Sequence, residues 1–171
     1  SDKSLISTSE MSGKIAAMAD ARASDETLII ARTDAIAVEG FEAAIERAEA
    51  YLAAGADALF IEAPRSGEEL RRIGEIFKGR AKLMANMVEG GHTPITAAAD
   101  LEQLGFDLVI FPGGIVRALA RTAEAYYASL MANGSNRPFA ENMFDFGELN
   151  QRLGTQDLLA EGKRYDGAEQ P

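Results

Sequence analysis

The chain has 171 residues, of which 47% are apolar and 26% charged, and its 17 Lys+Arg against 27 Asp+Glu give a formal net charge of −10. This is ordinary globular composition, with length for one average domain and no apolar run near the ~18 residues of a membrane span. The acidic balance argues against nucleic-acid binding, and zero Cys excludes disulfides, thiolate metal sites and a cysteine nucleophile within these residues.

The first part of the chain alternates helical patterns with short apolar runs. A helix over about residues 9–23 precedes a continuous apolar run at 27–31, which predicts a strand buried on both faces. Residues 41–54 place apolar side chains on one stripe with glutamates opposite, as in an amphipathic helix, and Gly55 ends it. A second buried strand is predicted at 58–61.

The alternation continues beyond this strand. Ser66 and Glu69 have the spacing of a capping box and predict a helix start, followed by a strand at 82–85. Thr93-Pro94 predicts the N-cap and first residue of another helix, which Gly105 closes.

A fourth strand is predicted at 108–111, and a longer helix at 115–131. After Gly134 the rhythm stops, and two short helices are predicted at 144–153 and 156–165. The pattern is a series of βα units, typical of (β/α)₈ barrels and doubly wound sheets. Four parallel strands do not close a barrel, so the chain predicts either a small open sheet or half of a barrel.

A weak internal repeat supports these units. Residues 54–61 resemble residues 104–111, and each copy holds a helix stop, a polar turn and a buried strand. The offset corresponds to two βα units.

Polar residues and a glycine pair follow the predicted strands, where α/β folds carry their chemistry. The candidates are Arg32, Glu62, Asn86, and the turn Pro112-Gly113-Gly114. Arginine suits bidentate binding of a carboxylate or phosphate, but it also fits an internal ion pair with Asp34 or Glu62. Asn86 could fix a carboxylate or enolate oxygen, or cap a turn.

The remaining chemistry-bearing residues give weaker signals. Two glycines before a helix could leave backbone N–H groups for an anion, or form a tight turn. His92, the one histidine, lies in a loop, where a histidine is more often incidental than catalytic. Nucleotide-binding, zinc-protease and hydrolase-elbow motifs are absent from the sequence.

Three segments together resemble a known family. They are Leu28-Ile-Ile-Ala-Arg-Thr-Asp-Ala35 with its followers Glu39 to Ala48, Gly55-Ala-Asp57 with Phe60-Ile-Glu62, and Asn86-Met-Val-Glu-Gly-Gly-His-Thr-Pro94 with Phe111-Pro-Gly-Gly114. These residues resemble the isocitrate lyase / phosphoenolpyruvate mutase superfamily over about residues 1–132.

The resemblance implies a (β/α)₈ TIM barrel of the phosphoenolpyruvate/pyruvate type. This chain would supply about strands five to eight, as residues 1–134, and a C-terminal helical tail, residues 135–171, swapped between subunits. The family's first four strands have no counterpart here, and they carry the acidic metal ligands and the mobile loop. We therefore expect Mg²⁺ as cofactor with its ligands in the missing N-terminal half, and assign no metal ligand or catalytic residue to this chain.

The resemblance also implies a substrate and residue roles. Arg32 matches the arginine that grips a substrate carboxylate, while Glu62 and Asn86 match positions of the lyase branch, with Pro112 and Gly113 completing the substrate-binding set. The expected enzyme is a carbon–carbon lyase that cleaves a small 2-hydroxy di- or tricarboxylic acid to a pyruvate-like enolate, as methylisocitrate and dimethylmalate lyases do.

Two alternatives stay open. One is a phosphoenolpyruvate mutase or carboxyvinyl-carboxyphosphonate phosphorylmutase reaction, and the other is a half-barrel that serves only assembly. Expected partners are the small carboxylic acid, the N-terminal half of the same barrel, and further copies in a tetramer, with no nucleic acid and no membrane. No signal segment opens the sequence, which favours a cytoplasmic location.

Overall fold

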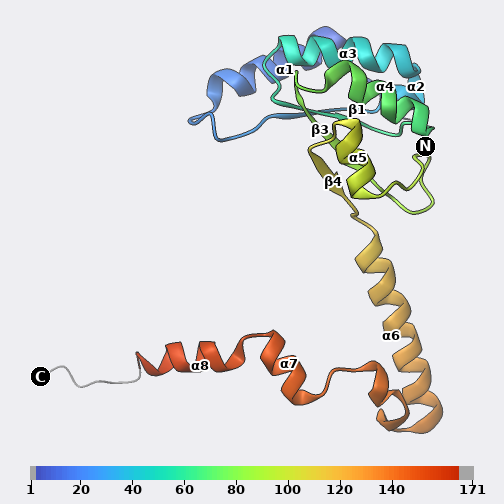
Figure 1. Ribbon diagram of the computed structural model, residues 1–171, viewed down its shortest axis with the longest axis vertical. Helices are drawn as coiled ribbons and strands as arrows, with labels where there is room; N and C mark the ends of the chain where they lie inside the picture. Colours follow the sequence, from blue (N-terminus) through green and yellow to red (C-terminus); the bar gives the residue numbers. More distant parts are fainter. Residues whose placement is uncertain (1–2, 166–171) are drawn as a thin grey trace, which may run out of the picture. The chain divides into compact units, whose positions relative to one another are not determined.

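The computed structural model describes residues 3–165 (Figure 1). It contains two compact units, residues 1–116 and residues 117–171. The boundary predicted at residue 134 divides a half-barrel from a helical tail, which is a different division from that between the two compact units. It stays a prediction.

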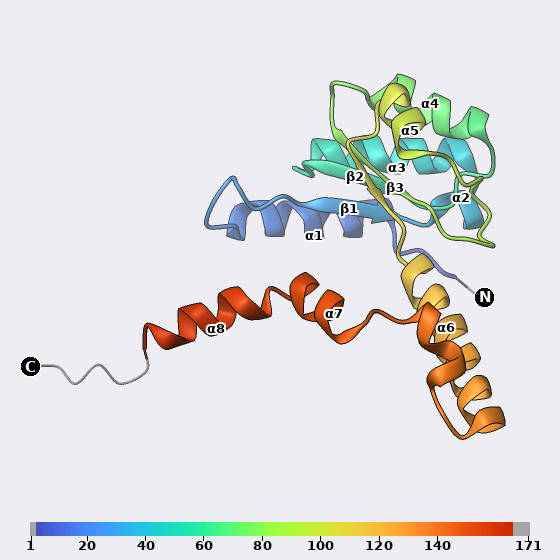
Figure 2. The ribbon, with the colours of Figure 1, turned by 60° about the horizontal axis from the view of Figure 1, so that its bottom comes forward.

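The first unit is built on a four-stranded parallel sheet in the order β1-β2-β3-β4 (Figure 2). Each strand is short and pairs with the next strand along the chain, as expected for successive βα units. The strands are β1 (Ile30–Thr33), β2 (Ala58–Ile61), β3 (Lys82–Asn86) and β4 (Leu108–Ile110). The predicted parallel α/β architecture is therefore confirmed.

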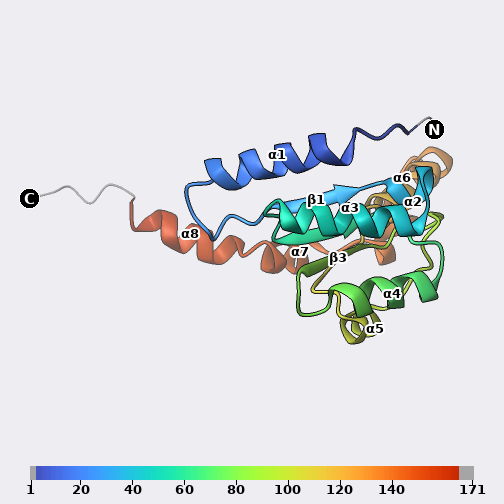
Figure 3. The same ribbon diagram turned by 90° about the horizontal axis from the view of Figure 1, so that it is seen from above.

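Helices cover one face of this sheet, with α1 packed against α3 and α4 against α5 (Figure 3). They are α1 (Thr8–Ala21), α2 (Ala35–Val38), α3 (Phe41–Ala53), α4 (Gly67–Phe77) and α5 (Ala98–Leu104). The core lies between the two layers and includes Ile15, Tyr51, Leu59, Phe77 and Leu83.

Alternation along the strands separates two sets of side chains. Ala31 of β1, Leu59 of β2 and Ala85 of β3 belong to the core beneath the helices. Because successive side chains of a strand point to opposite faces, Arg32 and Asn86 belong to the face turned away from the helices.

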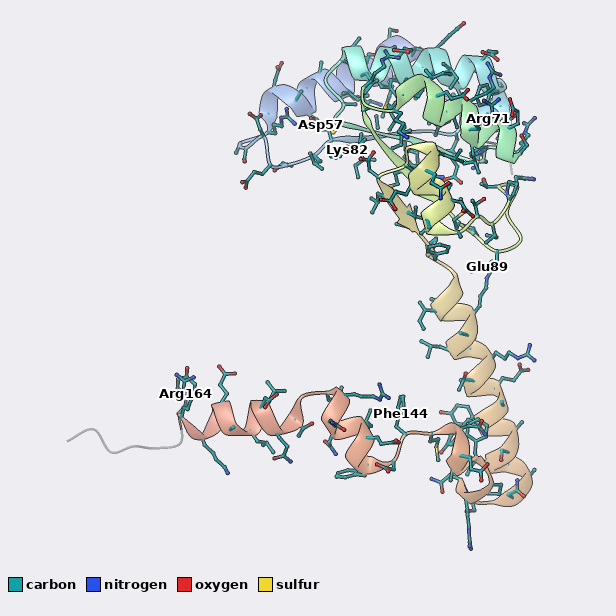
Figure 4. The ribbon with its side chains drawn as sticks, in the orientation of Figure 1. Asp57, Arg71, Lys82, Glu89, Phe144 and Arg164 are labelled. Carbon is teal, nitrogen blue, oxygen red and sulfur yellow. The ribbon has the colours of Figure 1, made fainter. Side chains whose placement is uncertain are left out.

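The internal repeat has a structural cause. Asp57 Oδ2 accepts a hydrogen bond from Ile29 N (2.8 Å), and Asp107 Oδ2 accepts one from Leu83 N (2.9 Å). Each aspartate thus binds the backbone of the neighbouring strand at its amino end, where Figure 4 labels Asp57 and Lys82. Gly55 and Gly105 precede them with φ of 105° and 101°, a conformation that favours glycine.

Two boundaries differ from the prediction. The first strand runs from Ile30 to Thr33, so Arg32 lies within it rather than behind it. Helix α5 begins at Ala98 instead of after Thr93, because Thr93 is buried and Thr96 N donates to Met87 Sδ at 3.4 Å. Those contacts hold residues 93–97 outside the helix, and Gly105 ends α5 as predicted.

The predicted cap of α4 is present with one change. Ser66 Oγ accepts a hydrogen bond from Glu69 N (3.1 Å), as an N-cap does. The Glu69 carboxylate accepts from Arg65 N at 2.6 Å, one residue before the cap. The amphipathic stripe of α3 also contains an unpredicted member, because Arg47 is only 7% exposed.

The second unit is helical in its described part. It contains most of α6 (Gly114–Asn133), a 3₁₀ helix η1 (Arg137–Asn142), α7 (Phe146–Arg152) and α8 (Thr155–Lys163). Asp145 and Glu148 form a reciprocal capping box at α7, and the rings of Tyr126 and Phe139 meet edge to face. The two predicted tail helices are confirmed with shorter bounds.

Within residues 3–165, no helix is both long and apolar enough to cross a bilayer.

Candidate functional site

Three candidate residues lie where β1, β2 and β3 end. Arg32 is the third residue of β1, Glu62 follows β2 directly, and Asn86 is the last residue of β3. All three have even residue numbers, and their odd-numbered neighbours Ala31, Ile61 and Ala85 belong to the core. The three candidates therefore share the sheet face opposite the helices, at its carboxyl edge.

The Arg32 guanidinium is held by contacts on three sides. Its Nε donates to Asp34 Oδ2 (3.0 Å) and its Nη2 to Asp34 Oδ1 (3.3 Å). The same Nη2 lies 3.1 Å from Glu62 Oε2, and the guanidinium carbon lies 4.8 Å from the centroid of the Phe60 ring. The internal ion pairs weighed for Arg32 thus form with both carboxylates.

One nitrogen of this arginine keeps its donor capacity. Arg32 Nη1 donates no hydrogen bond to any of the described residues, and the side chain is 49% exposed. A guanidinium fixed in this way needs little reorganisation to bind an acid.

The contacts shift the titration of the pair. Hydrogen bonding to Asp34 raises the pKa of Arg32 above its already high ordinary value. Hydrogen bonding from Arg32, with a smaller contribution from Lys3, lowers the pKa of Asp34. Both groups are therefore charged at neutral pH.

Glu62 also contacts Asn86. Asn86 Nδ2 donates to Glu62 Oε2 at 3.4 Å. Asn86 Oδ1 is buried and has no hydrogen-bond partner among the described residues. Buried amide oxygens are rarely left so, and this one suits a hydroxyl or a protonated acid.

A pocket of about 180 Å³ opens beside this pair. Its lining includes Glu62, Asn86, Lys3 and His92. The sequence reasoning missed the last two as site residues. The position of His92 directly after Gly90-Gly91 was the available signal, whereas no motif marks Lys3.

Pro112 and Gly113 lie in the turn between β4 and α6 and do not line this pocket. The turn approaches the loop after β3 instead, because a Cβ placed on Gly114 would lie 3.1 Å from Glu89 Oε1. Their predicted role in substrate binding stays a prediction.

A magnesium ion needs several oxygen ligands at one point. Residues 3–165 contain no group of three or more His, Cys, Asp or Glu side chains placed to hold a metal. The described residues therefore do not by themselves fit a magnesium site.

Comparison with known proteins shows the family of this chain. Residues 1–131 match the family model described as phosphoenolpyruvate phosphomutase. The chain belongs to this family. The match covers all four strands and all but the last two residues of α6.

Three curated relatives are similar to the chain over most of its length. The 2,3-dimethylmalate lyase of Eubacterium barkeri is 36% identical over 91% of this chain and 53% of its own length. The 2-methylisocitrate lyase of Shewanella oneidensis is 41% identical over 90% of this chain and 52% of its own length. The chloroplastic carboxyvinyl-carboxyphosphonate phosphorylmutase of Arabidopsis thaliana is 38% identical over 95% of this chain and 48% of its own length. The chain thus spans about half the length of the curated relatives it matches.

Solved structures agree with this family assignment. A 2,3-dimethylmalate lyase, described as a PEP mutase/isocitrate lyase superfamily member, superimposes with a TM-score of 0.81 at 26% identity. The superposition covers 94% of this chain and 57% of the chain of that lyase. A phosphonopyruvate hydrolase in complex with oxalate and Mg²⁺ superimposes with a TM-score of 0.79 at 27% identity, with 96% and 59% covered.

Proposed function

We propose that the protein containing this chain is a carbon–carbon lyase acting on a small 2-hydroxy di- or tricarboxylic acid. In this proposal Arg32 binds a substrate carboxylate, and Glu62 and Asn86 contact the part of the substrate beyond the bond that breaks. The two lyase relatives support this choice of reaction.

The geometry of Arg32 carries the proposal. Its guanidinium is fixed by Asp34, Glu62 and the Phe60 ring, while Nη1 and half of the side-chain surface remain accessible. The adjoining pocket of about 180 Å³ suits a small molecule rather than a polymer. A fixed cation beside a small pocket with a few polar groups is an arrangement that suits a small carboxylic acid.

The reaction proposed is a retro-aldol cleavage. A base takes the proton of the 2-hydroxyl group, the carbonyl forms, and the adjacent carbon–carbon bond breaks. Its electron pair passes to the carbon beside a carboxyl group of the other fragment, giving an enolate that is then protonated. Arg32 would hold an acid group in register with this bond, and Asn86 Oδ1 is placed to accept from a hydroxyl.

Turnover of the intact protein tests the proposal. We expect 2-methylisocitrate or 2,3-dimethylmalate to be cleaved, with a keto acid detected by a coupled dehydrogenase assay. Arg32→Met should abolish turnover, whereas Arg71→Met, which removes an exposed cation of α4 paired with Glu68 and Glu75, should leave it unchanged. Absence of cleavage of both acids by the intact protein would contradict the lyase assignment.

A second candidate is a phosphonate reaction of the mutase type. The 38% identity to the Arabidopsis phosphorylmutase favours it. Glu62 speaks against it, since the resemblance places histidine at this position in phosphonomutases. Turnover of phosphonopyruvate without turnover of the hydroxy acids would select this candidate.

Mg²⁺ is proposed as cofactor, on the strength of the Mg²⁺ complex of phosphonopyruvate hydrolase. Its ligands would come from residues outside those described here. Activity of the intact protein should fall on dialysis against EDTA and return on addition of Mg²⁺.

We also propose that the intact enzyme is a homotetramer and that it is located in the cytoplasm. The second unit leaves large apolar side chains accessible, among them Met131 and Phe146 (each 86% exposed) and Leu158 (65%). Such side chains favour burial against another copy. Light scattering of the intact protein at micromolar concentration would show a mass four times that of the monomer.

A further inference from the structure

A single carboxylate oxygen joins Arg32 to a second cation. Asp34 Oδ1 accepts from Arg32 Nη2 at 3.3 Å and from Lys3 Nζ at 2.5 Å. Lys3 comes from the segment before α1, 31 residues away from Asp34 in sequence. Its side chain is 43% exposed, so the ammonium keeps donors that face solvent.

The segment that carries Lys3 is anchored at its other end. Arg47 Nη1 donates to the Ile6 carbonyl at 3.0 Å, and Ser7 Oγ caps α1 by accepting from Glu10 N. Arg47 is itself fixed by two hydrogen bonds to the Glu39 carboxylate (2.9 and 3.1 Å). Lys3 therefore lies beside Asp34 on a segment held to α3, and it lines the same pocket as Glu62 and Asn86.

The charges of this group decide what it can bind. Arg32 lies between Asp34 and Glu62, so these three side chains together carry a net charge of −1. Lys3 brings the group to zero. Without it, an approaching anion would meet an excess negative charge within several ångströms, in a partly desolvated place where such interactions are strong.

We propose that Lys3 is the charge-balancing residue of the anion site. It neutralises the carboxylate that fixes Arg32, and it thereby permits an acid with two negative charges to bind in the pocket. This inference rests on the proposed function and extends it, because it makes affinity for a dianion depend on Lys3 more strongly than affinity for a monoanion.

Calorimetric titration of the intact protein with two four-carbon acids tests the inference. Succinate carries two carboxylates and butyrate one. For Lys3→Met we expect the dissociation constant of succinate to rise roughly tenfold and that of butyrate about threefold, since the repulsion scales with ligand charge. Lys3→Arg keeps the charge and should stay within about twofold of wild type for both acids.

Two further variants separate charge from contact. Lys14→Met removes an exposed lysine of α1 that pairs with Glu10, and it should leave both constants unchanged. The double variant Lys3→Met/Asp34→Asn restores the charge balance while an amide oxygen remains for Arg32. It should therefore recover most of the succinate affinity that Lys3→Met loses.

The outcomes are distinct. Unchanged succinate binding in Lys3→Met, equal losses for both acids, or a double variant as weak as the single one would each overturn the role of Lys3. A Lys3→Met protein without a cooperative thermal transition would assign Lys3 to the fold instead and would overturn it too. If the wild-type protein binds neither acid and cleaves none, the proposed function fails with it. If wild type binds and cleaves while Lys3→Met behaves identically, only the inference on Lys3 fails.

Discussion

Arg32 and Glu62 meet across two neighbouring parallel strands, with 3.1 Å between Nη2 and Oε2. Register explains the meeting, because Arg32 pairs with Phe60 and Glu62 follows at the next position on the same face. The cation thus lies over the Phe60 ring with a carboxylate beside it, at the edge of the sheet where parallel strands of α/β proteins place their ligands.

Arg32→Lys should reduce the efficiency of the intact enzyme although the charge is kept. Lysine cannot make two hydrogen bonds to Asp34 and reach Glu62 with the same rigid group. We expect kcat/KM to fall by about 10²-fold, the equivalent of two charge-assisted hydrogen bonds at about 1.4 kcal/mol each. Steady-state kinetics measures this, with Arg71→Lys on the exposed surface of α4 as the control. A kcat/KM within twofold of wild type would remove the need for the guanidinium fork.

Glu62→Gln should separate binding from turnover. The change removes a negative charge beside Arg32, so a carboxylate inhibitor such as succinate should bind about 3–10-fold more tightly. Turnover should fall at the same time, because the contacts of Glu62 with Arg32 and Asn86 lose their charge. Calorimetry and initial rates measure the two effects, and Glu68→Gln on α4 is the matched control. Weaker inhibitor binding in Glu62→Gln would contradict the electrostatic argument.

Asp34 should make the protein sensitive to acid. Its pKa is lowered in the folded state, chiefly by the hydrogen bond from Arg32, so it contributes stability above its ordinary pKa of about 3.9. That contribution is lost as the pH falls through the lower, folded-state value. Urea unfolding between pH 6 and pH 2.5 should show wild type more stable than Asp34→Asn near neutrality, with the two curves converging in acid. Asp25→Asn, at a 99% exposed side chain, is the control, and a pH-independent gap for Asp34→Asn would contradict the assignment.

The sequence predicted those parts of the site that follow from local pattern. Continuous apolar runs located the strands, and the strand at 58–61 has the predicted bounds. Because parallel strands end at one edge, residues that follow them were expected together, and Glu62 and Asn86 do meet.

Contacts between segments distant in sequence were beyond this reasoning. Lys3 contacts Asp34 from a segment that Arg47 holds through the Ile6 carbonyl, and the sequence pattern of α3 did not predict that Arg47 is buried. The predicted start of α5 was wrong for a similar reason. Burial of Thr93 depends on tertiary packing, which a local N-cap pattern does not contain. Local sequence patterns thus predicted the helices and strands, whereas the contacts of the long charged side chains depend on the tertiary fold.

The two repeated aspartates should be unequal in their effect on stability. Asp57→Ala leaves the backbone N–H of buried Ile29 without its acceptor and also removes the partner of Arg22, at 2.8 Å. Asp107→Ala removes the acceptor of Leu83 N and only a 3.4 Å contact with Lys82. We expect losses of about 2–3 kcal/mol and about 1–2 kcal/mol, respectively, in the free energy of unfolding. Urea denaturation checks the order, and Asp57→Asn, which can still accept from Ile29 N, should fall between wild type and Asp57→Ala.

Gly74 should tolerate no side chain. It lies in α4 where that helix approaches the end of α5, and a Cβ there would come within 1.9 Å of the Leu104 carbonyl oxygen. Backbone cannot give way as a flexible side chain can, so the two helices would have to separate. Overpacking of this kind costs about 1–3 kcal/mol or more, which outweighs the ~1 kcal/mol that alanine gains over glycine in a helix. Gly67→Ala in the same helix is the matched control, because nothing lies within 4 Å of its Cβ position. Thermal denaturation should show a lower Tm for Gly74→Ala and an equal or higher one for Gly67→Ala, and equal melting of both variants would mean that the α4–α5 contact yields without cost.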